Sequence, residues 1–256
     1  MAVIGAFLPG TELAGKVALV TGASRKLGRE IARALACGGA IVAINARTSR
    51  DEAEKVAEEI RAGGGQAAAF LADVTDGEAV HAMVRGIIDR FRRIDILVLN
   101  AAIRAEVPFL EMSYEEWRRP LAMTLDGAFH CMQACLPEML RVGGGSIVTL
   151  GGLSSLTGAK RRVHGSVAKN GLLGMTRAVA REFGDRNVRA NCVAPGRMVT
   201  EPRPHRTTEP NAEAMIPLGR KGERVEVAAA VRFMCGPGAS FITGQLLYVN
   251  GGQYMH

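Results

Sequence analysis

The chain has 256 residues, of which 48% are hydrophobic and 22% charged, and its formal net charge is +7. This length and composition are typical of a compact protein with a sizeable core and exclude an intrinsically disordered chain. No apolar run approaches the roughly 18 residues that span a bilayer. The opening MAVIGAFLPG also lacks the basic start of a signal peptide, so we expect a cytoplasmic protein without membrane contact.

The positive charge is spread along the chain instead of forming lysine-rich blocks, and no zinc-finger spacing accompanies it. We therefore expect no nucleic-acid partner, and the charge favours a phosphate-bearing cofactor or a small anionic substrate. Five cysteines lie in apolar segments, and of these Cys131 and Cys135 are one helical turn apart. Because no cluster of His and Cys completes a site, we expect buried thiols and no metal centre.

Short runs rich in β-branched residues alternate with segments of helical periodicity along the whole chain. The runs expected to form strands are 16–21, 40–45, 67–72, 95–100, 146–150, 188–193 and 245–250. Between them lie segments with apolar residues at a helical period, such as REIARALACGG (29–39) and DEAEKVAEEIRAGGG (51–65). This alternation predicts an α/β fold with a Rossmann-type, doubly wound parallel sheet of seven strands and helices on both faces. We expect one domain over residues 1–256.

The segment 197–222 departs from this alternation. It is rich in proline and polar residues and precedes a helical stretch at 224–234. A connection of this length in a compact domain is usually a lid or a binding loop. Ligands of such sheets bind beyond the carboxyl ends of the strands, so we expect this segment to cover a substrate.

A glycine-rich turn follows the first expected strand in VTGASRKLGREIA (20–32). Gly22 permits a tight turn, Gly28 lets the following helix approach the sheet, and the first helical amides can receive a pyrophosphate. After the second expected strand, where an NAD enzyme has an acid, the chain instead reads NART (45–48). With Arg25 and Arg47 available for a 2′-phosphate, NADP(H) is favoured over NAD. The alternative is that these arginines are only solvated.

Further motifs follow in order along the chain: LADV (71–74), LNAA (99–102), VAPG (193–196), ITGQ (242–245) and VNGG (249–252). Together with the glycine-rich turn they resemble the classical short-chain dehydrogenase/reductase family over essentially the whole chain. The family's TGxxxGxG fingerprint departs here at its middle glycine, which is Lys26, as in the pteridine-reductase-like branch. The resemblance implies an NAD(P)-dependent oxidoreductase acting on a small molecule and a homo-oligomer, either a dimer or a tetramer. The positions that it implies at the cofactor are Gly22, Ser24, Arg25, Lys26, Leu27, Gly28, Arg47, Asp73, Val74, Asn100, Ala101, Lys169, Pro195, Gly196, Met198 and Thr200.

The family's chemistry uses an Asn on a central helix, a Ser after the fifth strand, and a Tyr and a Lys spaced YxxxK on the next helix. In VHGSVAKNG (163–171) the lysine is present as Lys169, but the tyrosine position is Gly165. The serine position is Gly152 and the asparagine position is Thr124. No change of register supplies a phenol close before the lysine, since the tyrosines of the chain are Tyr114, Tyr248 and Tyr254.

Two side chains are candidates to replace the missing groups. His164 adjoins the tyrosine position, and histidine transfers protons near neutral pH. If the segment is helical, however, His164 is turned about 140° from Lys169. Ser154 is a candidate to orient a substrate. The two glycines are expected to leave a hollow, and an anionic substrate is favoured by the basic residues expected around it: Lys160, Arg161, Arg162, Arg197, His205 and Arg206.

The sequence therefore predicts an NADP(H)-dependent oxidoreductase of the short-chain type with an atypical active site, which retains the lysine and has glycine at the serine and tyrosine positions. Two alternatives remain open. In the first, the chain is a catalytically inactive NADP-binding subunit or sensor of the same fold. In the second, it is a non-redox enzyme on the same scaffold.

Overall fold

Seven parallel strands form one sheet in the order β3-β2-β1-β4-β5-β6-β7. The computed structural model describes residues 7–199 and 214–255. The strands are β1 (Val17–Val20), β2 (Ile41–Ala46), β3 (Gln66–Leu71), β4 (Ile96–Leu99), β5 (Gly145–Leu150), β6 (Val188–Pro195) and β7 (Leu246–Val249). Each lies within a residue or two of a stretch expected from the sequence, and the doubly wound α/β prediction is confirmed.

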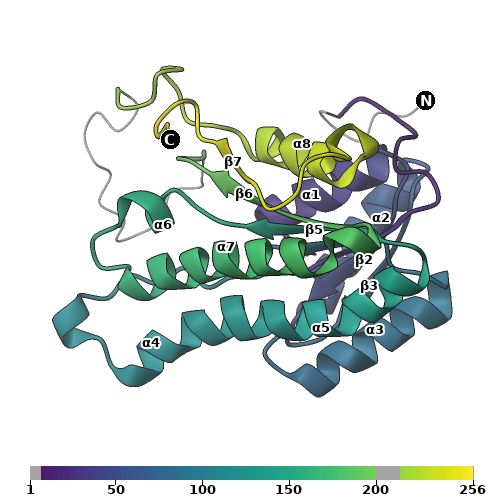
Figure 1. Cartoon of the computed structure of the whole chain (residues 1–256), viewed down its shortest axis with the longest axis horizontal. Helices are drawn as coiled ribbons and strands as arrows, with labels where there is room; N and C mark the ends of the chain where they lie inside the picture. The colour runs from purple at the N-terminus through teal and green to yellow at the C-terminus, as the bar shows by residue number, and fades with distance from the viewer. Residues whose placement is uncertain (1–6, 200–213, 256) are drawn as a thin grey trace.

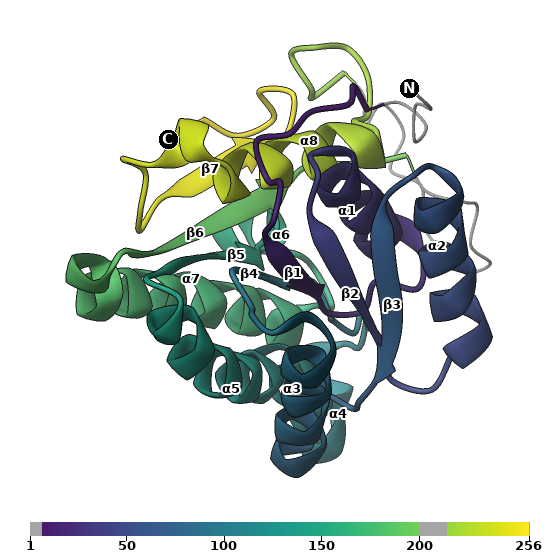
Figure 2. The ribbon, with the colours of Figure 1, turned by 90° about the vertical axis from the view of Figure 1, so that its right-hand side faces the viewer.

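Helices cover both faces of the sheet. They are α1 (Lys26–Cys37), α2 (Arg50–Ala62), α3 (Gly77–Phe91), α4 (Tyr114–Leu121), α5 (Gly127–Arg141), α6 (Ser154–Thr157), α7 (Val163–Phe183) and α8 (Arg224–Cys235). A π-helical turn, η2 (Ala122–Asp126), joins α4 to α5, and short 3₁₀ turns are η1 (Phe109–Glu111), η3 (Gly184–Arg186) and η4 (Pro237–Ala239). Figures 1 and 2 show α1, α2 and α8 on one side of the sheet and α3, α5 and α7 on the other.

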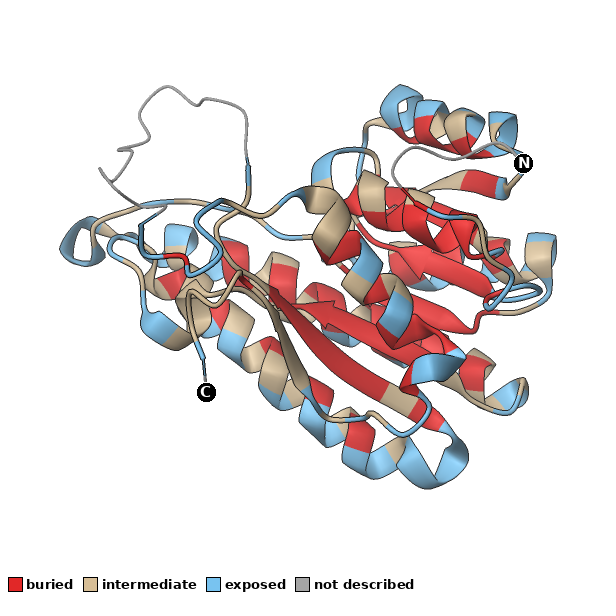
Figure 3. Ribbon diagram, turned by 90° about the horizontal axis from the view of Figure 1, so that it is seen from above, coloured by how far each residue is buried: buried red, intermediate tan, exposed pale blue. Residues whose placement is uncertain are grey.

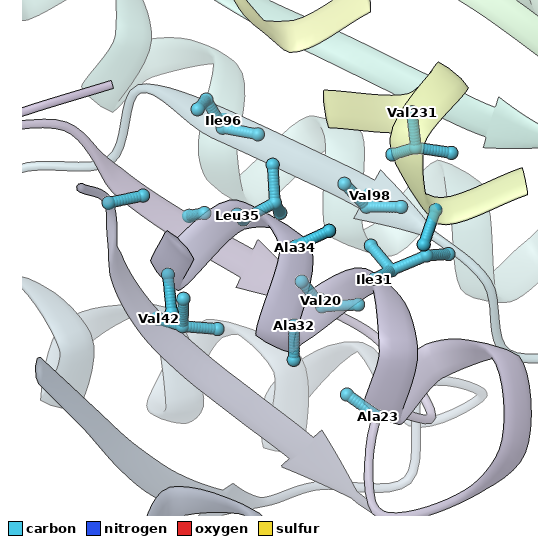
Figure 4. Close-up of a cluster of buried hydrophobic side chains, with 14 of the residues drawn as sticks. Val20, Ala23, Ile31, Ala32, Ala34, Leu35, Val42, Ile96, Val98 and Val231 are labelled. Atoms are coloured by element: carbon cyan, nitrogen blue, oxygen red, sulfur yellow. The ribbon is translucent and has the colours of Figure 1, made fainter. Parts of the chain in front are cut away.

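The sheet separates two hydrophobic clusters. In β1, Ala18 and Val20 face the cluster under α1 and α8, whereas Val17 and Leu19 face the cluster under α3 and α5. A strand that is buried on both faces reads as a continuous apolar run, which explains why these strands carry no alternating pattern. The central strands are buried along their length (Figure 3). Figure 4 shows Val20 and Val98 of the sheet packed with Ile31 and Val231 of the covering helices.

The strand order reverses between β1 and β4, where consecutive connections leave in opposite directions. In sheets of this type ligands bind at such a switch point, beyond the carboxyl ends of the strands. The turns after β1, β4, β5 and β6 all emerge at this edge. These turns are therefore the segments in which a functional site is expected.

Part of the predicted lid, 200–213, lies outside the described residues, as do Thr200, His205 and Arg206. The residues on either side of that part are joined, because Met198 and Gly222 form an isolated parallel bridge. In this bridge the amide of Val199 donates to the carbonyl of Gly222. The extent of the domain over 1–256 stays a prediction.

The five cysteines are free and buried, as expected. Within residues 7–199 and 214–255 no three His, Cys, Asp or Glu side chains are grouped so that they could hold a metal ion. In the same part of the chain, no helix has both the length and the apolar character needed to cross a membrane.

Candidate active site

The turn between β1 and α1 is shaped by its glycines. Gly22 has a φ of +60°, in the left-handed region that favours glycine. A Cβ on Gly28 would lie 2.3 Å from the carbonyl oxygen of Gly22, so α1 can approach the turn only with glycine there. Lys26, the first residue of α1, has a φ of +51°. This left-handed backbone conformation explains why the family's fingerprint has a glycine at this position. For a lysine the conformation costs about 1–2 kcal/mol of free energy.

Two polar side chains, the buried Thr21 and the half-buried Asn100, fix this turn against its neighbours. The hydroxyl of Thr21 accepts hydrogen bonds from the amides of Asn100 and Ala101 at 3.0 and 3.1 Å. The side-chain amide of Asn100 donates to the carbonyls of Thr21 and Gly22, both at 3.0 Å. The predicted residues Gly22, Asn100 and Ala101 are therefore held together by Thr21, which the sequence reasoning did not select.

Asn45 supports the same turn from β2. Its side chain is buried, accepts a hydrogen bond from the amide of Gly22 at 3.3 Å and donates to the carbonyl of Ala72 at 3.1 Å. The sequence reasoning took Asn45 only as one of the residues standing where an acid was expected. A polar residue at the end of an otherwise apolar strand was the available indication of this role.

Of the two predicted phosphate-binding arginines, Arg25 is the N-cap of α1 and Arg47 follows β2, and each has a carboxylate beside it. Arg47 is 3.9 Å from Asp73, measured between Nη1 and Oδ2, and Arg25 is 4.0 Å from Glu52. The hydroxyl of Ser24 donates to the same Glu52 carboxylate at 3.3 Å. Glu52, in the first turn of α2, is a further charged residue at this position that the sequence reasoning missed. These side chains are exposed enough to exchange partners when a ligand binds.

Other predicted cofactor positions lie on neighbouring turns. The carboxylate of Asp73 accepts hydrogen bonds from the amide and hydroxyl of Thr75, and Val74 packs against Gly127 of α5. After β6, a Cβ on Gly196 would lie 2.6 Å from the backbone of Asn250, so the chain passes close to the segment after β7. Leu27 and Met198 pack on the core, and Pro195 ends β6.

Lys169 lies on α7 with its amino group against the carboxyl end of β5. It is half-buried, and Nζ donates to the carbonyl of Leu150. Burial lowers the pKa of Lys169 to about 8; the nearby Cys192 opposes this shift and the charge of Arg162 adds to it. The ammonium form therefore predominates at neutral pH but is poised to release its proton just above it.

The two glycines that stand at the serine and tyrosine positions face open space. No heavy atom of the described residues lies within 4 Å of a Cβ built on Gly152 or on Gly165. Neighbouring glycines differ: a Cβ on Gly151 would lie 2.9 Å from Cys192, and one on Gly171 would lie 2.7 Å from Leu125. Both positions are thus open in the described part of the chain, and the expected substrate hollow around them stays a prediction.

Thr124, at the asparagine position, lies in the π-helical turn η2 and is buried. Such turns occur often at functional sites, because they shift a side chain out of helical register. Thr124 lines a cavity of about 10 Å³ together with Thr21, Ala101 and Gly127. This is room for about one water molecule next to the glycine-rich turn.

His164 and Ser154 are placed less directly for catalysis. Because α7 begins at Val163, His164 is helical and turned about 140° from Lys169. It is fully buried, and neither ring nitrogen has a hydrogen-bond partner among the described residues. Ser154, in α6 beside the start of α7 (Figure 1), accepts a hydrogen bond at its carbonyl from the hydroxyl of Ser166. The structure does not bring His164 to the face of Lys169, and both assignments stay predictions.

Comparison with known proteins gives one consistent result. A family model described as enoyl-(acyl carrier protein) reductase matches residues 22–254. The 3-oxoacyl-[acyl-carrier-protein] reductase FabG of Staphylococcus aureus is 38% identical over 242 residues, which cover 94% of this chain and 98% of the relative. The chain belongs to the classical short-chain dehydrogenase/reductase family. The 3-oxoacyl-[acyl-carrier-protein] reductase of Synechocystis is 39% identical over 246 residues, 96% of this chain and 99% of the relative.

The solved structures agree with this family. A protein assigned as a short-chain alcohol dehydrogenase from Sinorhizobium meliloti superposes with a TM-score of 0.87 at 35% identity, covering 96% of this chain and 98% of that one. As a short-chain dehydrogenase/reductase, the chain belongs to an oxidoreductase family. Its glycine-rich turn, the Asn100 side chain that anchors this turn, and the half-buried Lys169 lie at one edge of the sheet.

Proposed function

We propose that the protein is an NADP(H)-dependent short-chain oxidoreductase that reduces or forms a carbonyl group without the family's tyrosine and serine. The observation that carries this proposal is the half-buried Lys169, which shares the carboxyl edge of the sheet with the glycine-rich turn and the open space at Gly152 and Gly165. A lysine without the family's tyrosine and serine supports binding and orientation of a ligand more directly than it supports proton transfer.

The glycine-rich turn fits a dinucleotide. A Cβ at Gly28 would fill the cradle between α1 and Gly22, and the first amides of α1 lie at the positive end of its helix dipole. The residues that would hold the cofactor are the predicted ones at this edge, with Asn100 supporting the turn and Lys169 reaching toward a ribose. When bound, the nicotinamide supplies a hydride to a carbonyl carbon whose oxygen takes up one proton, so that a ketone becomes an alcohol and NADPH becomes NADP⁺.

The described residues of this site do not supply the proton that the carbonyl oxygen takes up. Gly165 carries no acid, and Lys169 holds its proton against the carbonyl of Leu150. Water in the hollow, or an acidic group of the substrate, is then the donor to the nascent alkoxide. Lack of a positioned general acid typically lowers the rate by roughly 10²–10⁴-fold, whereas binding and orientation are retained. We therefore expect slow turnover rather than none.

The preference for NADP(H) is proposed from charge. Arg47 follows β2, Arg25 is the N-cap of α1, and the residue that ends β2 is Ala46, not an acid. A charged hydrogen bond to a phosphate contributes about 1.5–3 kcal/mol, or about 10- to 150-fold in affinity. Arg47→Gln should therefore weaken NADPH binding to that extent in a fluorescence titration and leave NADH binding unchanged. The control is Arg85→Gln, an exposed arginine on α3. Equal affinity of the wild type for the two cofactors would contradict the preference.

The activity is tested by following the absorbance of reduced nicotinamide with a panel of ketones and oxo acids. Turnover that is lost in Lys169→Ala supports the proposal. Tight NADPH binding without turnover, even after Gly152→Ser and Gly165→Tyr together, would identify a non-catalytic subunit or sensor. Chemical conversion of a substrate with no change in that absorbance would identify a non-redox enzyme.

We also propose that the protein forms a homo-oligomer. Apolar side chains are exposed on α5 and in the segment that leads into α4: Phe109, Leu110, Tyr114 and Phe129, of which Leu110 is 98% exposed. Large exposed apolar groups are typical of surfaces that another protein covers. A mass from light scattering equal to two or four chains would support this, and a single-chain mass at micromolar concentration would refute it.

A further inference from the structure

A carboxylate of α2 reaches across to the glycine-rich turn. Glu52, in the first turn of α2, accepts a hydrogen bond of 3.3 Å at Oε2 from the hydroxyl of Ser24. The same oxygen lies 4.0 Å from Nη1 of Arg25, the N-cap of α1. A hydroxyl and a guanidinium that converge on one oxygen are also donors that a phosphate oxygen takes. Glu52 therefore lies where we expect the 2′-phosphate of NADP(H).

A second ion pair fixes the face of α2 from which Glu52 projects. Arg29 of α1 donates from Nε and Nη2 to the carboxylate of Glu59 at 2.8 to 2.9 Å, so this pair is closed and joins the two helices. Glu59 follows Glu52 by seven residues, which is close to two helical turns. Both carboxylates therefore lie on the face of α2 that is turned toward α1.

The pair of Glu52 and Arg25, in contrast, is open. At 4.0 Å the carboxylate attracts the guanidinium without a hydrogen bond, and the two side chains are 49% and 67% exposed. Such a pair contributes little to folding and exchanges partners readily. An acid in the first turn also favours the dipole of α2, but Asp51 in the same turn already supplies one. The stability of α2 therefore does not account for the contact of Glu52 with Ser24.

The other carboxylate near this turn is held differently. Asp73 lies 3.9 Å from Arg47, but it accepts hydrogen bonds from the amide and hydroxyl of Thr75 at 2.9 and 2.8 Å. These bonds keep Asp73 in its own turn after β3. Glu52 instead accepts its hydrogen bond from Ser24 of the glycine-rich turn. Of the two acids, Glu52 is thus the one that shares donors with an incoming phosphate.

We propose that Glu52 is a specificity-determining residue, which occupies the position of the 2′-phosphate and thereby limits the preference for NADP(H) over NAD(H). This inference rests on the proposed function, which assigns the glycine-rich turn to a dinucleotide. A 2′-phosphate has to displace the carboxylate from Ser24 and Arg25, and the two negative charges repel each other. The 2′-hydroxyl of NAD(H) meets no such repulsion, because it is neutral and donates a hydrogen bond to a carboxylate.

The test uses two nucleotides that differ only in this phosphate, adenosine 2′,5′-bisphosphate and 5′-AMP. Their binding is measured by calorimetry, which requires no turnover. Glu52→Gln removes the charge and keeps an oxygen that accepts from Ser24. It should raise the affinity for the bisphosphate about 5- to 30-fold, the effect in water of one charge about 4 Å from a phosphate with one to two charges. The affinity for 5′-AMP should stay within about twofold, and the gain should shrink in about 1 M salt.

The matched control is Glu58→Gln, which removes the same charge at an exposed position of α2 and should leave both affinities unchanged. An equal gain in this variant would overturn the proposal, by assigning the effect to net charge. Unchanged or weaker binding of the bisphosphate by Glu52→Gln would also overturn it. If the wild type binds the two nucleotides alike and Glu52→Gln prefers the bisphosphate, the role of Glu52 stands and the proposed preference of the wild type for NADP(H) fails. If both proteins bind the two nucleotides alike, the preference and the role of Glu52 fail together.

Discussion

Adding side chains at the two open glycines should increase carbonyl reduction. Gly165 lies in the first turn of α7, and a Cβ built on it would meet no described heavy atom within 4 Å. A Cβ built on Gly152 would likewise meet none. Gly165→Tyr places a phenol four residues before Lys169, on the same helix face. The ammonium of Lys169 would lower the pKa of that phenol and help it to donate its proton.

The expected magnitudes follow from these contacts. A positioned proton donor contributes roughly 10²–10⁴-fold to the rate, so kcat/KM of Gly152→Ser with Gly165→Tyr should rise by that factor. Gly165→Ala avoids any clash and removes a poor helix former, which stabilises the fold by up to about 1 kcal/mol. For a domain of this size the melting temperature should rise by up to about 4 °C. Gly171→Ala, whose Cβ would lie 2.7 Å from Leu125, should instead cost about 1–3 kcal/mol.

The assay compares initial rates of NADPH oxidation with one ketone across the single and double variants. NADPH affinity and the melting temperature are measured on the same samples, so that a misfolded variant is recognised. A double variant that folds, binds NADPH as the wild type does and shows no increase in rate would refute the reasoning. The open space at Gly165 would then not be where a substrate carbonyl receives its proton.

Three further outcomes are expected. NADPH affinity should decline as pH rises through about 8, where Lys169 loses its proton, and Lys169→Met should show no such step in a fluorescence titration. The pKa of Lys169 is about 8 in the folded chain and has its ordinary value of 10.5 in the unfolded chain, so between these pH values the unfolded chain binds more protons. The free energy of unfolding, measured by urea denaturation, should therefore rise with pH in this range. Lys169→Met should show no such rise. Gly28→Ala should abolish NADPH binding and lower the melting temperature, since its Cβ would lie 2.3 Å from the carbonyl oxygen of Gly22. The control Gly174→Ala, whose Cβ has no described neighbour within 4 Å, should change neither property.

Much of the fold could be predicted because its strands are buried on both faces. Each central strand reads as an uninterrupted apolar run such as Val17–Val20, and glycines mark the ends of the helices between them. The nucleotide turn could be predicted for a similar reason. Gly22 and Gly28 are required by backbone conformation and close approach, which are local properties of the chain.

The residues that were missed depend on directions that a sequence pattern does not encode. Asn45 is the last residue but one of β2, and only the pleat of this strand decides that its side chain turns inward to Gly22. Glu52 reaches Ser24 from a separate helix, across a large sequence separation. The place where α7 begins decides one further case: starting at Val163, it turns His164 away from Lys169.

The glycines of the site divide into two physical classes. A side chain at Gly28 or Gly196 would collide with neighbouring backbone, so these glycines are explained by packing alone. Gly165 avoids no collision and has no left-handed backbone, yet glycine in a helix costs up to about 1 kcal/mol relative to alanine. Packing within the described residues therefore does not account for it. Space kept for a bound substrate is the explanation that the proposed function gives.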